Sequence, residues 1–393
     1  MRAARRFVRG ILLMPLPLAC AAPVPERAPE EVPEWTLRRG LVIGSPDDPI
    51  YGFSAVGSVL ADDDRVYVLL RQEGTIRVFT RDGEFVRDLG GGRGAGPAEM
   101  TVPTMMGWRG PGTLWVGDEV LRRFTFYDVA TGEAETIPYH LYASDAHGTT
   151  RFQPLVAMAG FRAAAVALPS NSAPARGTFT TLTMVALDTA GTVRDTLALL
   201  SVALGTEITA GVASDGVLRV SHPLEEGDTW RFASDGSSAV IVNGKSWTGA
   251  GPTDFGVTTV SSDGDTLFHR RLAYEPRPVP DGYYDDYINP LLDTPVVVDR
   301  REVADAVREF YEQTRYLPPV TSVRLGGDGT VWLAGVDEDG EREWLVLDGS
   351  GSSIGRFRLP TTSRVSYANQ TEAWVVERDA LDIPYVVRYD IVR

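Results

Sequence analysis

Beyond Trp35 the chain consists of short apolar runs separated by turn residues. The runs are rich in Val, Thr, Tyr, Trp and Leu, and Asp-Gly, Gly-Asp or Gly-Pro pairs punctuate them. This texture is typical of antiparallel strands joined in hairpins. Helical periodicity is nearly absent outside one segment. The pattern therefore predicts an all-β protein.

Two short motifs alternate along this region, each in six copies. The first is an apolar triplet after a turn, centred on Tyr67, Trp115, Val166, Val240, Trp332 and Trp374. The second is an apolar run that leads into Asp82, Asp128, Asp188, Asp263, Asp348 and Asp390. Successive triplets are 42 to 92 residues apart. The shorter spacings match a four-stranded propeller blade of ~40–50 residues, and the longer ones imply insertions. We predict one six-bladed β-propeller over residues 35–393.

The last repeat is one strand short. After Trp374 only about a hairpin's length of chain remains, whereas residues 35–44 (WTLRRGLVIG) form an apolar strand without a blade of its own. We expect that segment to complete the sixth blade, because pairing of the N- and C-terminal strands removes an open sheet edge.

Three segments carry a resemblance to a known group of proteins. They are residues 76–100 (IRVFTRDGEFVRDLGGGRGAGPAEM), residues 326–335 with their VWLAG strand, and residues 383–393 (IPYVVRYDIVR). Together with the blade rhythm they resemble six-bladed propellers related to NHL repeats, which occur as secreted or lipid-anchored bacterial proteins. The resemblance implies the fold. For function it implies binding of a protein or ligand in most members and lyase or metal-dependent hydrolase activity in a minority.

An insertion at residues 275–318 interrupts the β pattern. Val303, Val307 and Tyr311 lie on one helical stripe, and Asp299 is a candidate N-cap, so we predict an amphipathic helix over residues 300–316, halted by Pro318. The preceding segment holds three tyrosines, Tyr283, Tyr284 and Tyr287. They are the candidate ligand-binding residues of the chain, as part of a lid over one propeller face. The alternative is that helix and tyrosines only cover the outer edge of two blades.

The N-terminus has the layout of a bacterial secretory signal. Four arginines precede an apolar stretch too short to span a bilayer, and the stretch ends at Cys20. Its end resembles a lipobox, which implies a signal peptide over residues 1–19 and lipidation of Cys20. Ordinary cleavage after Ala21 is the alternative. The Pro-rich residues 20–34 then form an extended tether.

Composition limits the partners. The chain has 38 Lys+Arg against 53 Asp+Glu, a formal charge of −15, and a single Cys. Such acidity argues against nucleic acid and against an electrostatic hold on anionic lipid, so we expect membrane contact only through the lipid anchor. One Cys excludes an intramolecular disulfide and a Cys-based metal cage. We expect a monomer.

No local motif identifies a catalytic or metal site. Residues 90–97 (GGGRGAGP) lack the Lys-Ser/Thr of a phosphate-binding loop, so we interpret them as a connection between blades. We interpret the acidic runs 62–64 and 337–341 as turns, because Asp and Gly are common turn residues. The four histidines share no metal-binding spacing, and paired arginines such as Arg122-Arg123 read as surface residues.

We therefore expect no catalytic residues, no cofactor and no bound metal. The predicted function is an exported, lipid-anchored scaffold in the bacterial cell envelope, or a soluble periplasmic or secreted one, that binds a protein, peptide or small ligand. The alternative function is a metal-dependent lyase or hydrolase with its site at the axial channel.

Overall fold

The computed structural model describes residues 31–139, 142–145, 148–158, 163–168, 178–204, 207–210, 218–221, 224, 227–243, 252–292, 300–312 and 314–393. The signal segment, Cys20 and most of the tether lie outside these residues. Residues 32–393 form one compact unit, which contains every strand and helix that the structure describes.

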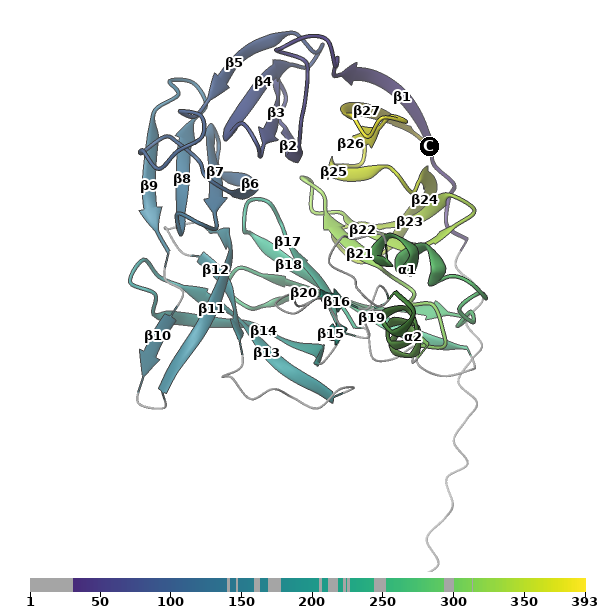
Figure 1. Ribbon diagram of the computed structural model, residues 1–393. Coiled ribbons are helices and arrows are strands. Elements are labelled where there is room, and N and C mark those ends of the chain that lie inside the picture. The colour runs from purple at the N-terminus through teal and green to yellow at the C-terminus, as the bar shows by residue number, and fades with distance from the viewer. Residues whose placement is uncertain are drawn as a thin grey trace, which may run out of the picture. The chain divides into compact units, whose positions relative to one another are not determined.

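Six antiparallel sheets surround a central axis (Figure 1). Blade 1 comprises β2 (Val56–Ala61), β3 (Arg65–Leu70), β4 (Thr75–Thr80) and β5 (Phe85–Leu89). Blade 2 comprises β6 (Pro103–Gly110), β7 (Thr113–Asp118), β8 (Arg123–Asp128) and β9 (Ala134–Pro138). Blade 3 comprises β10 (Tyr142–Asp145), β11 (Gly148–Ala157), β12 (Ala163–Leu168), β13 (Thr178–Leu187) and β14 (Val193–Leu204).

The second half of the ring follows the same order. Blade 4 comprises β17 (Thr229–Phe232), β18 (Ser238–Val242), β19 (Thr253–Ser261) and β20 (Thr266–Tyr274). Blade 5 comprises β21 (Ser322–Leu325), β22 (Val331–Glu338), β23 (Glu341–Leu347) and β24 (Ser353–Pro360). Blade 6 comprises β25 (Arg364–Ala368), β26 (Glu372–Arg378), β27 (Pro384–Val392) and β1 (Thr36–Ile43). The predicted six-bladed β-propeller is confirmed.

The repeated motifs mark equivalent strands. Five of the six apolar triplets lie in the second strand of a blade, in β3, β7, β18, β22 and β26, and the sixth lies in β12, the middle strand of the five-stranded blade 3. These strands are buried on both faces between neighbouring blades, which is why they read as continuous apolar runs. Trp115, Trp332 and Trp374, at the centre of three triplets, are at most 1% exposed.

The N-terminal strand closes the ring. β1 pairs antiparallel with β27, with Thr36 opposite Val392 and Ile43 opposite Val386. Trp35, just before β1, is buried, and its ring lies 6.3 Å from that of Trp332 in blade 5. The predicted N-to-C closure is therefore confirmed, and the packing of Trp35 on Trp332 stabilises the position of β1 beside blade 5.

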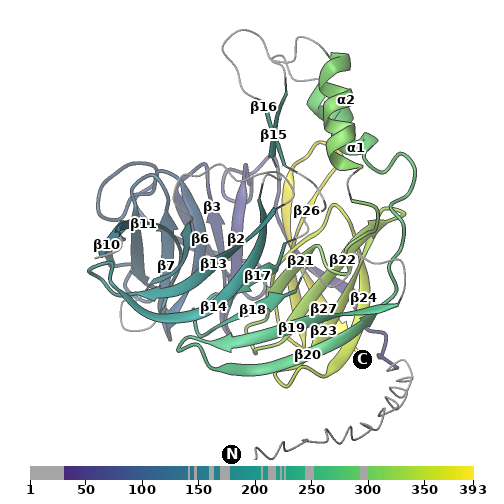
Figure 2. The same cartoon turned by 90° about the horizontal axis from the view of Figure 1, so that it is seen from below.

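The ring has two unlike faces. We call the side with the connections between blades, such as residues 90–102 and 275–321, the connection face. We call the side with the turns between first and second strands, such as residues 62–64 and 233–237, the hairpin face. In Figure 2, α1 (Asp285–Leu292), α2 (Arg300–Tyr311) and the hairpin of β15 (Glu207–Ala210) and β16 (Leu218–Ser221) stand together on one side of the ring. They belong to the two long connections and so mark the connection face.

The insertion differs from its prediction in two ways. The stripe residues Val303, Val307 and Tyr311 are buried as expected, but α2 ends at Tyr311 and not at residue 316. It ends early because residues 315–317 pair with 277–279, through Val279 N–H to Arg315 O (3.0 Å) and Leu317 N–H to Arg277 O (2.8 Å). The helix α1 and the β15–β16 hairpin were not predicted. Within the described part of the chain no helix is long and apolar enough to cross a membrane.

Candidate functional site

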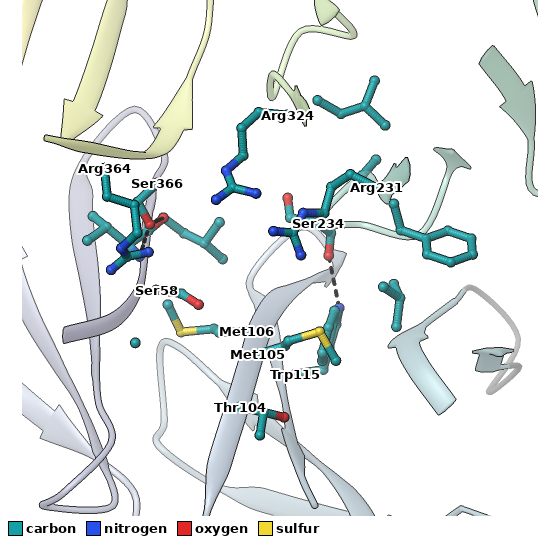
Figure 3. A pocket seen from close by; sticks show the side chains of 17 residues that line it. Ser58, Thr104, Met105, Met106, Trp115, Arg231, Ser234, Arg324, Arg364 and Ser366 are labelled. Atoms are coloured by element: carbon teal, nitrogen blue, oxygen red, sulfur yellow. Dashed lines mark hydrogen bonds between the residues drawn. The ribbon is translucent and has the colours of Figure 1, made fainter. Parts of the chain in front are cut away.

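The innermost strands of all six blades enclose a cavity of about 200 Å³ at the axis (Figure 3). We call it the axial cavity. Its described lining consists of residues 57–60 of β2, 104–106 of β6, Trp115, Val156, residues 231–234, Arg324, Leu325, Arg364 and Ser366. A propeller brings these strands together because each blade turns one strand toward the axis, which is β11 in blade 3 and the first strand in the other five.

Three arginines from three successive blades line one side of the axial cavity. They are Arg231 on β17, Arg324 on β21 and Arg364 on β25. In Figure 3, Arg324 and Arg231 lie across the cavity from Met105 and Trp115, and Arg364 lies at one side, with Ser58 between it and Met106.

Two of the three guanidinium groups are held by backbone carbonyls. Arg364 Nη2 donates to Val56 O at 2.9 Å, and Arg324 Nε donates to Val365 O at 3.2 Å. Arg231 makes no hydrogen bond or ion pair with the described part of the chain, and its side chain is exposed within the cavity.

Burial and the neighbouring positive charges disfavour the charged forms of these arginines. Burial, together with the positive charges of Arg231, Arg364 and Arg342, lowers the pKa of Arg324 to about 9. Burial likewise lowers the pKa of Arg231 and of Arg364. All three stay protonated at neutral pH, because a guanidinium keeps its proton well above pH 7. A concentrated positive charge therefore sits at the axis.

No acidic group among the described lining residues neutralises this charge inside the cavity. Among its described lining residues there is no Asp, Glu or His, although the whole chain carries a formal charge of −15. Like charges gathered in a partly desolvated space cost free energy unless an opposite charge joins them. Planar guanidinium groups bind carboxylate and phosphate oxygens through paired, charge-assisted hydrogen bonds. The arrangement can thus bind a small anion.

A further arginine extends the positive charge toward the connection face. Arg71 follows β3 on that face and is exposed. Its positive charge helps to lower the pKa of Arg364, although burial and the charges of Arg378 and Arg231 are larger causes. Its side chain crosses Gly57, where a Cβ atom would lie 2.7 Å from Arg71 Cγ. An anion that approaches from the connection face therefore meets Arg71 before the cavity.

Ala233 and Ser234 form the floor of the axial cavity. The Ser234 carbonyl accepts hydrogen bonds from Trp115 Nε1 (3.0 Å) and from Trp108 N–H (3.1 Å), which join blade 4 to blade 2 across the axis. This approach requires Gly107, because a Cβ atom there would lie 1.7 Å from Ser234 O. The glycine and the buried tryptophan thus fix the floor.

A second hollow, of about 560 Å³, opens on the hairpin face below this floor. Its rim includes Asp62, Asp63, Asp64 and Asp235. Asp62 caps its own turn, since Oδ1 accepts the N–H groups of Asp64 and Arg65, and Oδ2 accepts the Tyr67 hydroxyl. The interpretation of residues 62–64 as a turn is confirmed. Within the described residues no three His, Cys, Asp or Glu side chains come together as a metal site.

The tyrosines singled out from the sequence lie together, away from the axial cavity. Tyr283 and Tyr284 contact edge to face with centroids 5.4 Å apart, and Tyr287 lies 5.7 Å from Tyr283. Tyr284 is buried and donates to Thr314 O at 3.2 Å, whereas Tyr287 is 38% exposed. Burial is the main cause of the raised pKa of Tyr283. These contacts hold α1 against α2.

The other residues considered in the sequence analysis lie in turns or make contacts that stabilise the fold. Gly90 and Gly92 have positive φ angles, as expected of a connection between blades, and Arg123 donates to the Glu99 and Ala95 carbonyls beside them. His269 Nδ1 lies 2.8 Å from Thr258 Oγ1 on the neighbouring strand. The other three histidines fall outside the described residues, as does Cys20.

The axial arginines were not among the sequence candidates. An alignment of the blade sequences on their apolar triplets would have given a weak signal for two of them. Arg231 and Arg324 lie opposite Val240 and Trp332, which are the central residues of the triplets in their blades. Arg364 lies opposite Val376, outside its triplet, so alignment would not have placed it with the others.

The sequence matches no protein-family model and no curated protein. Solved structures with similar folds include a DUF4221-family protein from Bacteroides vulgatus, with a TM-score of 0.51 and 10% identity over 91% of this chain and 98% of that one. A candidate exported protein from Bacteroides fragilis has a TM-score of 0.43 and 9% identity over 92% and 99%. Virginiamycin B lyase from Staphylococcus aureus has a TM-score of 0.38 and 9% identity over 91% and 100%. At such low identity the likeness to the first of these shows the fold alone.

Proposed function

We propose that this protein is an exported binding protein of the bacterial envelope, related to the NHL-type propellers, whose axial cavity binds a small anion. The observation that carries the proposal is the meeting of Arg231, Arg324 and Arg364 in a cavity whose described lining holds no acidic residue. A bound anion would offset the repulsion among the three guanidinium groups. The role is non-catalytic, and the propeller serves as a rigid frame.

Binding should be measurable by titration calorimetry of the purified protein with acetate, phosphate and sulfate. At least one of these anions is expected to bind saturably, with an affinity that falls as NaCl is added. Acetamide, which has the shape of acetate without its charge, is the matched control and should not bind. Absence of binding for all three anions at millimolar concentrations would refute the proposed function. Calorimetry is preferable to thermal shifts alone, since sulfate and phosphate stabilise most proteins by exclusion from their surfaces.

The export part of the proposal rests on residues 1–20. Four arginines, an apolar stretch and Cys20 follow one another there as in a lipoprotein signal. Mass spectrometry of the mature protein from a bacterial host should find an N-terminal Cys20 that carries a diacylglyceryl group, and Cys20→Ala should release the protein from the membrane fraction. A mature protein that begins at Ala22 without lipid would show ordinary secretion instead.

A further inference from the structure

The arginines of the axial cavity all come from blades 4 to 6, whereas most of its apolar side chains come from blades 1 to 3. Arg231, Arg324 and Arg364 lie on strands of blades 4 to 6, where Phe232 and Leu325 also line the cavity. The apolar lining of blades 1 to 3 carries no charge and consists of Val59, Leu60, Met105, Met106, Trp115 and Val156. Two hydroxyl groups interrupt the apolar wall. Thr104 donates to Gly117 O at 3.3 Å, and Ser58 lies between Arg364 and Met106 (Figure 3).

This asymmetry discriminates between kinds of anion. Phosphate and sulfate carry oxygens on all sides, so some of these oxygens would face methyl and thioether groups and lose hydrogen bonds to water without replacement. A monocarboxylate carries both oxygens at one end, where guanidinium groups can bind them side by side. Its hydrocarbon tail can then cover the apolar wall, which removes apolar surface from water on both partners.

The size of the cavity indicates the length of tail that it can cover. About 200 Å³ is roughly the space of six or seven water molecules in the liquid. A carboxylate group and a tail of two to four carbons fill such a space.

We infer that the axial cavity binds a short-chain aliphatic monocarboxylate, with the carboxylate on the three arginines and the tail against Met105 and its apolar neighbours. This inference rests on the proposed function and names the chemical class of its ligand. It selects against inorganic oxyanions and against dicarboxylates, whose second charge would meet the apolar wall.

Calorimetric titration of the purified protein with acetate, butyrate, succinate and phosphate tests the ligand class. Butyrate has two more methylenes than acetate and should bind about fifteenfold more tightly, at about fourfold per buried methylene. It should also bind more tightly than succinate or phosphate. Tightest binding of phosphate or succinate would overturn the monocarboxylate inference while small-anion binding stands. Absence of binding for all four would overturn both.

Substitutions at Met105 test the position of the tail. Met105 is partly buried against the core between blades 2 and 3 and lines the cavity. Met105→Gln should bring the affinity for butyrate close to that for acetate. Met105→Leu, the matched control, should keep the preference for butyrate. An unchanged preference in Met105→Gln would show that the tail does not lie on this wall and would overturn the inference.

Discussion

Arg231→Met is expected to weaken binding of acetate or butyrate in the axial cavity about 10- to 100-fold, the effect of losing a charge-assisted hydrogen bond. The same change should leave the ligand-free protein at least as stable as the parent. Arg231 makes no hydrogen bond or ion pair with the described residues, and its charge contributes to the lowered pKa of Arg324 and Arg364. Replacing the Arg231 guanidinium group therefore reduces its repulsion with Arg324 and Arg364, and it deprives no described group of a hydrogen-bond partner.

Calorimetry for binding and thermal unfolding in a weakly binding buffer for stability together check this result. Arg38→Met is the matched control, because it removes the same charge from β1, where Arg38 is 72% exposed and pairs with Asp390. The control should bind like the parent protein. A large loss of stability in ligand-free Arg231→Met, or unchanged binding, would contradict the role assigned to the arginine cluster.

Gly107→Ala is expected to destabilise the protein by about 3 kcal/mol or more. The new methyl group would lie 1.7 Å from Ser234 O and 2.6 Å from the Trp115 ring, so either the floor of the cavity or strand β6 must move. The movement would also break the hydrogen bond from Trp115 Nε1 to Ser234 O. Urea unfolding followed by tryptophan fluorescence measures the loss.

Gly349→Ala is the matched control for this change. A Cβ atom at Gly349 meets nothing within 4 Å, and the backbone there is not in the left-handed region. Its stability should stay within about 0.5 kcal/mol of the parent. If Gly107→Ala unfolds at the same urea concentration as Gly349→Ala, the close approach of blades 2 and 4 is not a fixed part of the fold.

The blades could be predicted from sequence because their signals are local. A triplet such as Val331-Trp332-Leu333 is apolar throughout because its strand is covered on both faces. The next apolar run of the same blade leads into an Asp that begins a turn. Each repeat can therefore be recognised without its neighbours. Closure by residues 35–44 could be predicted by counting strands. The end of α2 could not, since it depends on pairing between residues 277–279 and 315–317, which no helical pattern records.

The axial site could not be predicted because its residues have no local pattern. Arg231, Arg324 and Arg364 lie in three different blades, and each is a single arginine in a short strand. Arginine is the usual basic residue of this chain, so none of them stands out in composition. Only the ring geometry brings them to one cavity, and only the absence of acids from its described lining distinguishes them from arginines in surface ion pairs.

Anomalous diffraction from a crystal equilibrated with sodium bromide tests the central claim most directly, because bromide is a small anion with its own scattering signal. The account predicts a bromide peak in the axial cavity within hydrogen-bonding reach of Arg231 and Arg324, and loss of that peak when butyrate is added. Bromide peaks elsewhere on the surface, with an axial cavity that holds none, would contradict it.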